Sequence, residues 1–169
     1  MIHYAGIGSR EMPPNVFQAI KDLAKMLCIN GLVLRSGGAK KGADKAFEQG
    51  ADDVVRRAKN NLVMLDTATM KEIMLPWDTT EKAREEAAKH HPGWHHCSRH
   101  ARRCHGRNTQ IVLGRELDSP VNFVACWTKN EHYGGTSQGI RVARAYRIPV
   151  VNLAKIPVEQ WLEECLKWV

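Results

Sequence analysis

Short apolar runs alternate along the chain with longer segments of mixed polarity. Five runs have the length and composition of buried strands: 2–5, 32–34, 62–65, 121–127 and 149–152. Between them, apolar residues recur at helical spacing in six segments: 14–30, 43–51, 80–89, 98–113, 135–146 and 157–169. Strands that alternate with helices in this way predict a parallel sheet covered by helices on both faces.

The pattern predicts one α/β domain over residues 1–169, with a mainly parallel sheet in a Rossmann-like arrangement. Residues 66–96 are less regular, and we interpret them as an irregular insertion. No run approaches the roughly 18 apolar residues of a membrane-spanning helix, so no membrane contact is expected. The first residues read directly as a strand rather than as a signal peptide, and the five cysteines are scattered, which indicates a cytoplasmic protein.

The net charge of +7 is unevenly distributed. Residues 87–115 contain no Asp or Glu, and this histidine-rich segment holds six basic residues: Lys89, Arg99, Arg102, Arg103, Arg107 and Arg115. Such a segment suits a polyanion, a phosphorylated ligand or an acidic protein partner, and a solvated basic face remains the alternative.

Three glycine-rich turns follow predicted strands, at 6–10, 36–42 and 134–137. In parallel sheets these turns lie together at the carboxyl edge, where helix N-termini and glycine backbones accommodate phosphate groups. We therefore expect a nucleotide pocket there, and no cofactor. "GIGSRE" lacks the third glycine of the dinucleotide fingerprint and "GAKKGADK" has the wrong spacing for a Walker motif, which argues against ordinary NAD dehydrogenases and P-loop NTPases.

Four segments together resemble the SLOG superfamily of Rossmann-like domains: "YAGIGSRE", "LRSGGAKKGADKAFEQGA", "HPGWHHCS…HGRN" and "ACWT…GGTSQGIRVARAYRIPVVNL". The nearest resemblance is to small, stand-alone DprA-like proteins, many of them carried by phages. The superfamily also contains the LOG enzymes, which hydrolyse the N-glycosidic bond of nucleoside 5′-monophosphates. The resemblance implies a nucleotide-shaped pocket at the carboxyl edge of the sheet, and an assembly into dimers or larger homo-oligomers.

Matching positions of the motifs indicate ligand-binding residues. Gly134-Gly135-Thr136 resembles the phosphate-binding part of the LOG motif, Arg107-Asn108 a basic pair that faces the ligand, and Ser36-Gly37-Gly38 with Asp44 a turn of the superfamily. With the other turn residues, the predicted ligand-binding set is Gly6, Gly8, Ser9, Arg10, Arg35, Ser36, Gly37, Gly38, Arg107, Asn108, Gly134, Gly135, Thr136, Ser137 and Gln138.

The catalytic glutamate of the LOG motif is missing, because its position is occupied by Gly139. Glycoside cleavage needs a carboxylate, and Asp44 and Glu48 share one helix face at i and i+4. These two residues are our candidates for catalysis. The sequence leaves two possibilities open: the protein is a nucleoside-monophosphate N-glycosidase, or it only binds its ligand.

Two alternatives to an enzyme remain. A DprA-like protein would bind single-stranded nucleic acid through the basic segment, with Trp94 as a stacking surface, and a sensor or sponge would hold a nucleotide-derived signal without turnover. The histidine-rich segment also contains zinc-compatible spacings, of which His96, His100 and Cys104 are an example. The lack of a paired C-x-x-C motif argues against zinc, and we predict no metal site.

Overall fold

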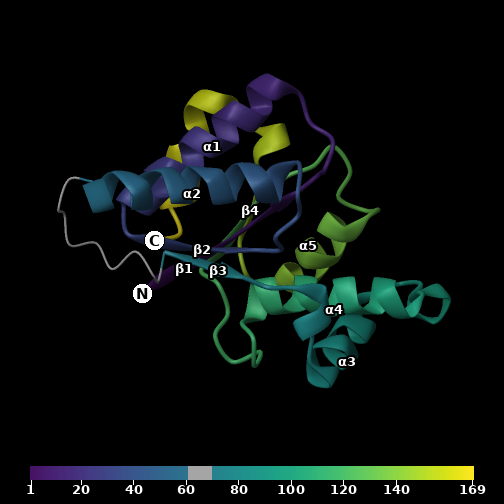
Figure 1. Ribbon diagram of the computed structural model, residues 1–169. Helices are drawn as coiled ribbons and strands as arrows, with labels where there is room; N and C mark the ends of the chain where they lie inside the picture. Colours follow the sequence, from purple (N-terminus) through teal and green to yellow (C-terminus); the bar gives the residue numbers. More distant parts are fainter. Residues whose placement is uncertain (61–69) are drawn as a thin grey trace.

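The computed structural model describes residues 1–60 and 70–169. All strand pairs are parallel, and the order across the sheet is β3-β2-β1-β4-β5 (Figure 1). The strands are β1 (Ile2–Gly8), β2 (Leu32–Ser36), β3 (Lys71–Ile73), β4 (Phe123–Trp127) and β5 (Val150–Asn152). The predicted α/β fold with a parallel sheet is confirmed.

Helices cover both faces of the sheet. The upper layer in Figure 1 contains α1 (Pro14–Ile29), α2 (Ala43–Asn60) and the short C-terminal α6 (Trp161–Leu166). The lower layer contains α4 (Arg99–Leu113) and α5 (Gly135–Ala145), and α3 (Glu81–His90) packs on the outside of α4. Among the described residues, no helix is long and apolar enough to cross a membrane.

The central strands are buried on both faces, which explains their continuous apolar runs. In β4, Phe123 and Ala125 join the core beneath α1 and α2, whereas Val124 and Cys126 join the core beneath α4 and α5. Trp127 belongs to the first of these cores and is only 7% exposed. Its indole is therefore a packing element at the carboxyl end of the strand.

The elements between α2 and α4 differ most from expectation. The strand predicted at 62–65 lies outside the described residues, and the strand that pairs with β2 is Lys71–Ile73. The described part of the expected irregular segment holds this strand, α3 and two short 3-10 turns, Pro76–Asp78 and Trp94–His96. The helix expected at 80–89 is confirmed as α3, which begins at an N-cap on Thr80, and the strand and the 3-10 turns make the rest of the segment more regular than expected.

The C-terminal helix is shorter than predicted, because residues 158–160 form a 3-10 turn before α6 begins. Trp161 and Cys165 are buried against the upper layer, whereas Trp168 and Val169 are about half exposed. An exposed apolar end is compatible with an interface, and the homo-oligomer stays a prediction.

Candidate nucleotide-phosphate site

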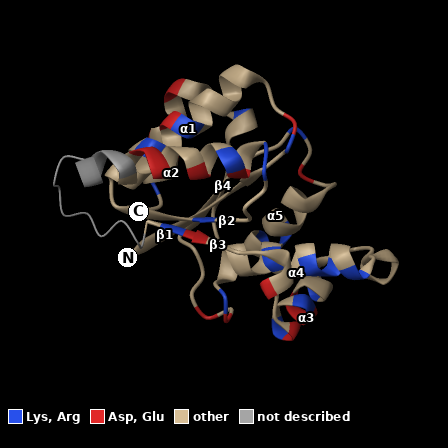
Figure 2. Cartoon of the chain, in the orientation of Figure 1, with Lys and Arg blue, Asp and Glu red and all other residues tan. Residues whose placement is uncertain are grey.

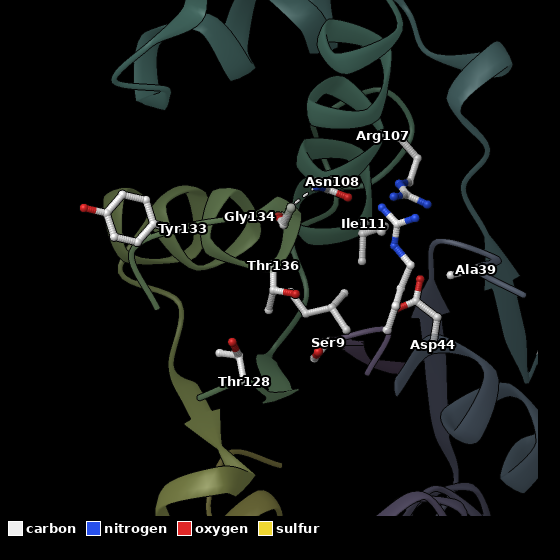
Figure 3. Close-up of a pocket in the computed structure, with 14 residues that line it drawn as sticks. Ser9, Ala39, Asp44, Arg107, Asn108, Ile111, Thr128, Tyr133, Gly134 and Thr136 are labelled. Carbon is white, nitrogen blue, oxygen red and sulfur yellow. Dashed lines mark hydrogen bonds between the residues drawn. The ribbon is translucent and has the colours of Figure 1, made fainter. Parts of the chain in front are cut away.

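A cavity of about 290 Å³ opens at the carboxyl edge of the sheet, between the ends of β1 and β4 and the starts of α2 and α5 (Figure 3). Nine of the predicted site residues line it: Gly8, Ser9, Arg10, Asp44, Arg107, Asn108, Gly134, Gly135 and Thr136. The remaining walls come from Ile7, Ala39, Ile111, Thr128 and Tyr133. Parallel sheets bind ligands at the carboxyl ends of their strands, and the cavity lies there, bordered by the turns after β1, β2 and β4.

The start of α5 faces this cavity without a side-chain cap. Its N-cap residue Gly134 has φ 89°, a left-handed conformation that favours glycine. A Cβ at Gly134 would meet nothing within 4 Å, so this corner of the cavity is open. The first N–H groups of α5 therefore remain available to an anion, and the helix dipole adds to their attraction.

The helix α4 supplies the polar wall next to this helix start. Asn108 is buried and donates a hydrogen bond of 2.9 Å to the carbonyl oxygen of Gly135. Arg107 donates through Nη1 to the carbonyl oxygen of Gly37. Its Nε is buried and has no hydrogen-bond partner among the described residues. Arg107 therefore brings a positive charge to the cavity wall.

Asp44 brings a buried carboxyl group to the same side of the cavity as Arg107 (Figure 3). Its side chain is 7% exposed and accepts hydrogen bonds from the backbone N–H groups of Ala39 and Gly37. Burial raises the pKa of Asp44 to about 6, although the Arg107 charge and the two N–H groups act in the opposite direction. The carboxyl group can therefore exchange a proton near neutral pH.

Gly37 allows Arg107 and Asp44 to approach each other. A Cβ on Gly37 would lie 2.3 Å from Arg107 Nη1 and 2.8 Å from Asp44 Oδ2. A Cβ at these separations would force both side chains to move, so the glycine permits their close packing. Gly37 was predicted to bind the ligand, but it does not line the cavity. It instead leaves room for Arg107 and Asp44, which do line it.

Glu48, the second predicted catalytic residue, does not line the cavity. Its Oε1 accepts hydrogen bonds from Ser36 Oγ at 2.8 Å and from the Gly38 backbone N–H at 3.1 Å. Burial raises the pKa of Glu48, while the hydroxyl of Ser36 acts against this rise. The Glu48 carboxylate therefore stabilises the turn between β2 and α2. Ser36 and Gly38 donate to this carboxylate and do not line the cavity.

Four other predicted ligand-binding residues also lie outside the cavity wall. Arg35 is buried, pairs with Glu72 of β3 and donates to Ser119. Gly6 makes room for packing, since a Cβ there would lie 2.6 Å from Leu34 Cδ1. The last two, Ser137 and Gln138, are buried in the first turns of α5: the Ser137 hydroxyl donates to Gly134, and the Gln138 amide donates to Ala87 of α3.

Tyr133 is a lining residue that the sequence analysis did not assign to the site. Its side chain is 79% exposed and stands at the opposite side of the cavity from Arg107 (Figure 3). A second hollow, which includes Lys129, shares Ser9, Thr128 and Tyr133 with the cavity. The tyrosine ring thus stands between two adjoining hollows, where a base can stack on it. The sequence did contain a signal for this role, because Tyr133 immediately precedes the predicted ligand-binding residue Gly134.

The basic segment continues the site along α4, which projects beyond the sheet (Figure 2). Arg99, Arg103 and Arg107 are spaced at i, i+4 and i+8, so they follow one face of the helix towards the cavity. Arg99 and Arg103 are exposed and border a further hollow with Arg102. Trp94, the predicted stacking residue, is half-buried, and the Arg102 guanidinium lies 5.4 Å from its ring centroid.

Comparisons with known proteins identify the fold. No protein-family model and no curated protein matches the sequence. A solved structure of DNA processing protein A from Helicobacter pylori, reported for its single-stranded DNA binding mode, is similar over 98% of this chain and 80% of that chain. The TM-score is 0.58 and the sequences are 17% identical, so the likeness concerns the fold alone. The chain therefore has a Rossmann-like α/β fold similar to that of DNA processing protein A.

Proposed function

We propose that the protein binds single-stranded nucleic acid and seats one phosphate of the strand at the start of α5. The observation that carries this proposal is the line of arginines at 99, 103 and 107, which ends at the cavity wall. Successive members of the line are about 6 Å apart along the helix axis, as four residues at about 1.5 Å each. A flexible polyanion can follow such a line, whereas a free mononucleotide would reach only its last member.

The aromatic and electrostatic features of the cavity support the same function. Proteins that bind single strands combine a positively charged groove with exposed aromatic rings on which bases stack. Tyr133 provides such a ring between two hollows, and the uncapped start of α5 provides a phosphate position. The neighbour of similar fold is itself described by its binding of single-stranded DNA, which agrees with the proposal.

Fluorescence anisotropy with a labelled oligothymidine tests the proposal. We expect the double variant Arg99→Gln/Arg103→Gln to bind at least about tenfold more weakly than the unmodified protein at moderate salt. The matched control removes two exposed arginines outside the basic segment, Arg144→Gln/Arg147→Gln, and should bind almost normally. Equal losses in the two double variants, or no binding of single strands by the unmodified protein, would contradict the proposal.

Hydrolysis of a nucleoside 5′-monophosphate is a second candidate, favoured by one observation. Asp44 is the one carboxylate among the described cavity-lining residues, and its raised pKa of about 6 leaves it ionised at pH 7. A carboxylate at this place can stabilise positive charge on a ribosyl group or activate water. Incubation with a panel of 5′-mononucleotides, followed by chromatography for free base, decides the question. Base release that disappears in Asp44→Asn would establish the reaction, and no release from any mononucleotide would exclude it.

A further inference from the structure

Two histidines and a cysteine from three successive segments meet beside α4, away from the cavity. His91 follows α3, Cys97 follows the Trp94–His96 turn, and His105 lies on α4. One potential ligand atom from each lies within 4.8 Å of those from the other two. The imidazole centroids of His91 and His105 are 4.3 Å apart. The fold thus gathers these three groups from residues that are up to 14 positions apart in the sequence.

The separations approach those of a metal site. Cys97 Sγ lies 3.8 Å from His91 Nδ1 and 3.9 Å from its Nε2. A tetrahedral zinc ion with Zn–S of about 2.3 Å and Zn–N of about 2.0–2.1 Å holds a sulfur and a nitrogen roughly 3.5 Å apart. Coordination would bring Cys97 and His91 closer by a few tenths of an ångström, and side-chain rotation would aim the ring nitrogens at the ion and bring in the His105 nitrogen, which lies within 4.8 Å of both partners.

A buried nitrogen in the cluster lacks a partner. Nδ1 of His105 is inaccessible to solvent and makes no hydrogen bond within the described part of the chain. Burial lowers the pKa of His105 to about 4, and the charges of His91, Arg141 and Arg107 act in the same direction, so the ring is neutral at pH 7. Buried polar atoms are nearly always satisfied by a protein group, a water or an ion. A metal ion would satisfy this one.

We propose that His91, Cys97 and His105 bind one Zn²⁺ ion, with the fourth position open to water or another ligand. One thiolate and two imidazoles form a donor set that is typical of zinc and matches neither Mg²⁺ nor Ca²⁺, which prefer oxygen. The nearby Arg107 and Arg141 oppose a dication, and the negative thiolate offsets part of this repulsion. The site does not depend on the proposed binding of nucleic acid.

Metal binding would change a hydrogen bond in the loop. In the structure, His91 Nδ1 accepts a hydrogen bond of 3.1 Å from the Gly93 backbone N–H. Coordination through Nδ1 uses that lone pair, and coordination through Nε2 requires the proton on Nδ1, so the bond to Gly93 is lost in both cases. The ion would then link the loop before α4 directly to the helix. Cys97 borders the open hollow next to Arg99, which gives the ion a path from solvent.

Cobalt binding to the 169-residue chain, after removal of metals with a chelator, tests this inference. We expect one Co²⁺ per chain, with a thiolate-to-cobalt charge-transfer band and the visible bands of four-coordinate cobalt, and displacement by one equivalent of Zn²⁺. Cys97→Ser should abolish the charge-transfer band. It should also weaken Zn²⁺ binding by more than about 100-fold, since even outer-shell changes cost up to that much.

The matched control is Cys104→Ser, because Cys104 Sγ lies 3.5 Å from His100 Nε2 in a similar Cys–His pair on α4. This variant should bind cobalt like the unmodified protein. If Cys97→Ser does not fold, alkylation of the unmodified chain decides: Zn²⁺ should protect Cys97 and leave Cys104 reactive, as read by mass spectrometry. The inference is overturned if cobalt gives no thiolate band, if Cys97→Ser binds normally, or if Zn²⁺ does not protect Cys97.

Discussion

The side-chain amide of Asn108 donates a hydrogen bond of 2.9 Å to the carbonyl oxygen of Gly135. Asn108 lies on α4 and Gly135 is the first residue of α5, so this bond joins the arginine-bearing helix to the helix whose start faces the cavity. This buried amide therefore helps, together with the apolar core that α4 and α5 share, to fix the positive side chains relative to the free N–H groups.

We expect Asn108→Ala to lower both stability and affinity for single strands. Loss of the bond should cost about 1 kcal/mol, equivalent to roughly 2–4 °C in Tm for a domain of this size. Affinity should fall several-fold because the start of α5 is no longer fixed. The control is Asn122→Ala, which removes the side-chain oxygen that accepts a hydrogen bond from the His3 backbone N–H; Asn122 immediately precedes β4, at the end of the strand away from the cavity. Thermal denaturation and anisotropy together check the prediction: both variants should be less stable, and only Asn108→Ala should bind less. An unchanged affinity would contradict it.

The buried carboxyl group of Asp44 should give the protein a distinct pH dependence. Its pKa is about 6 in the folded protein, compared with an ordinary value of 3.8. Between these values the folded protein retains a proton that the unfolded chain releases, so the free energy of unfolding falls as the pH rises from about 4 to 6. The full effect is about 3 kcal/mol at 1.36 kcal/mol per pKa unit.

Urea denaturation of the unmodified protein and Asp44→Asn at several pH values measures this contribution. The difference in unfolding free energy between the two proteins should change by up to that amount between pH 4 and pH 7, in favour of the variant at the higher pH. Glu86 and Glu131, whose pKa values are lowered to about 2, are present in both proteins and cancel from the difference. Parallel pH profiles for the two proteins would refute the prediction.

Gly37→Ala should impair binding with little effect on stability. The new Cβ would displace the Arg107 guanidinium and the end of the Asp44 side chain, which are side-chain and not backbone atoms, so the fold can adapt while Arg107 loses its position on the cavity wall. Gly31→Ala is the matched control and should do the reverse: it should lower stability and leave binding unchanged. At Gly31 φ is 82° and space is free, so alanine costs about 1–2 kcal/mol in backbone strain and leaves the cavity unchanged. Melting temperatures and oligothymidine affinities that fall together in both variants would disprove this separation.

The arginine line should also determine the salt dependence of binding. Each phosphate contact on a single strand contributes about 0.7 to the slope of log K against log salt concentration. Loss of Arg99 and Arg103 should therefore reduce the slope by about 1.4. Anisotropy titrations at four or more salt concentrations measure it. A slope that does not change would mean that neither arginine contacts the strand.

The glycine-rich turns were predictable from sequence because their function depends on local geometry. A strand, a glycine and a helix start are enough to predict that residues 134–136 face the carboxyl edge, and the cavity is found there. Of the strand predicted at 121–127, residues 123–127 form β4. The first two predicted residues, however, are outside the sheet strand, and the Val121 N–H bonds to the carbonyl oxygen of Val112 instead.

Side-chain roles that depend on distant partners were not predictable. Asp44 and Glu48 share a helix face, but the sequence does not reveal that the Glu48 carboxylate already accepts hydrogen bonds from Ser36 and Gly38. Arg35 is similar, because its partner Glu72 lies on a three-residue strand without an apolar pattern. The zinc-compatible spacing of His96, His100 and Cys104 assumed one helix, but His96 lies in the turn before α4. The cluster in the structure instead joins His91, Cys97 and His105 from three segments.

The hydrogen bonds from the β2–α2 turn to Glu48 affect the kinetics of ligand binding. The turn is already held by Ser36 and Gly38 before any ligand arrives, so one wall of the cavity does not have to fold during binding. Association should then resemble rigid docking, in which the encounter is guided by the positive charges on α4 and no slow loop closure intervenes. Differences in affinity among ligands would in that case appear mainly in how long each one stays bound.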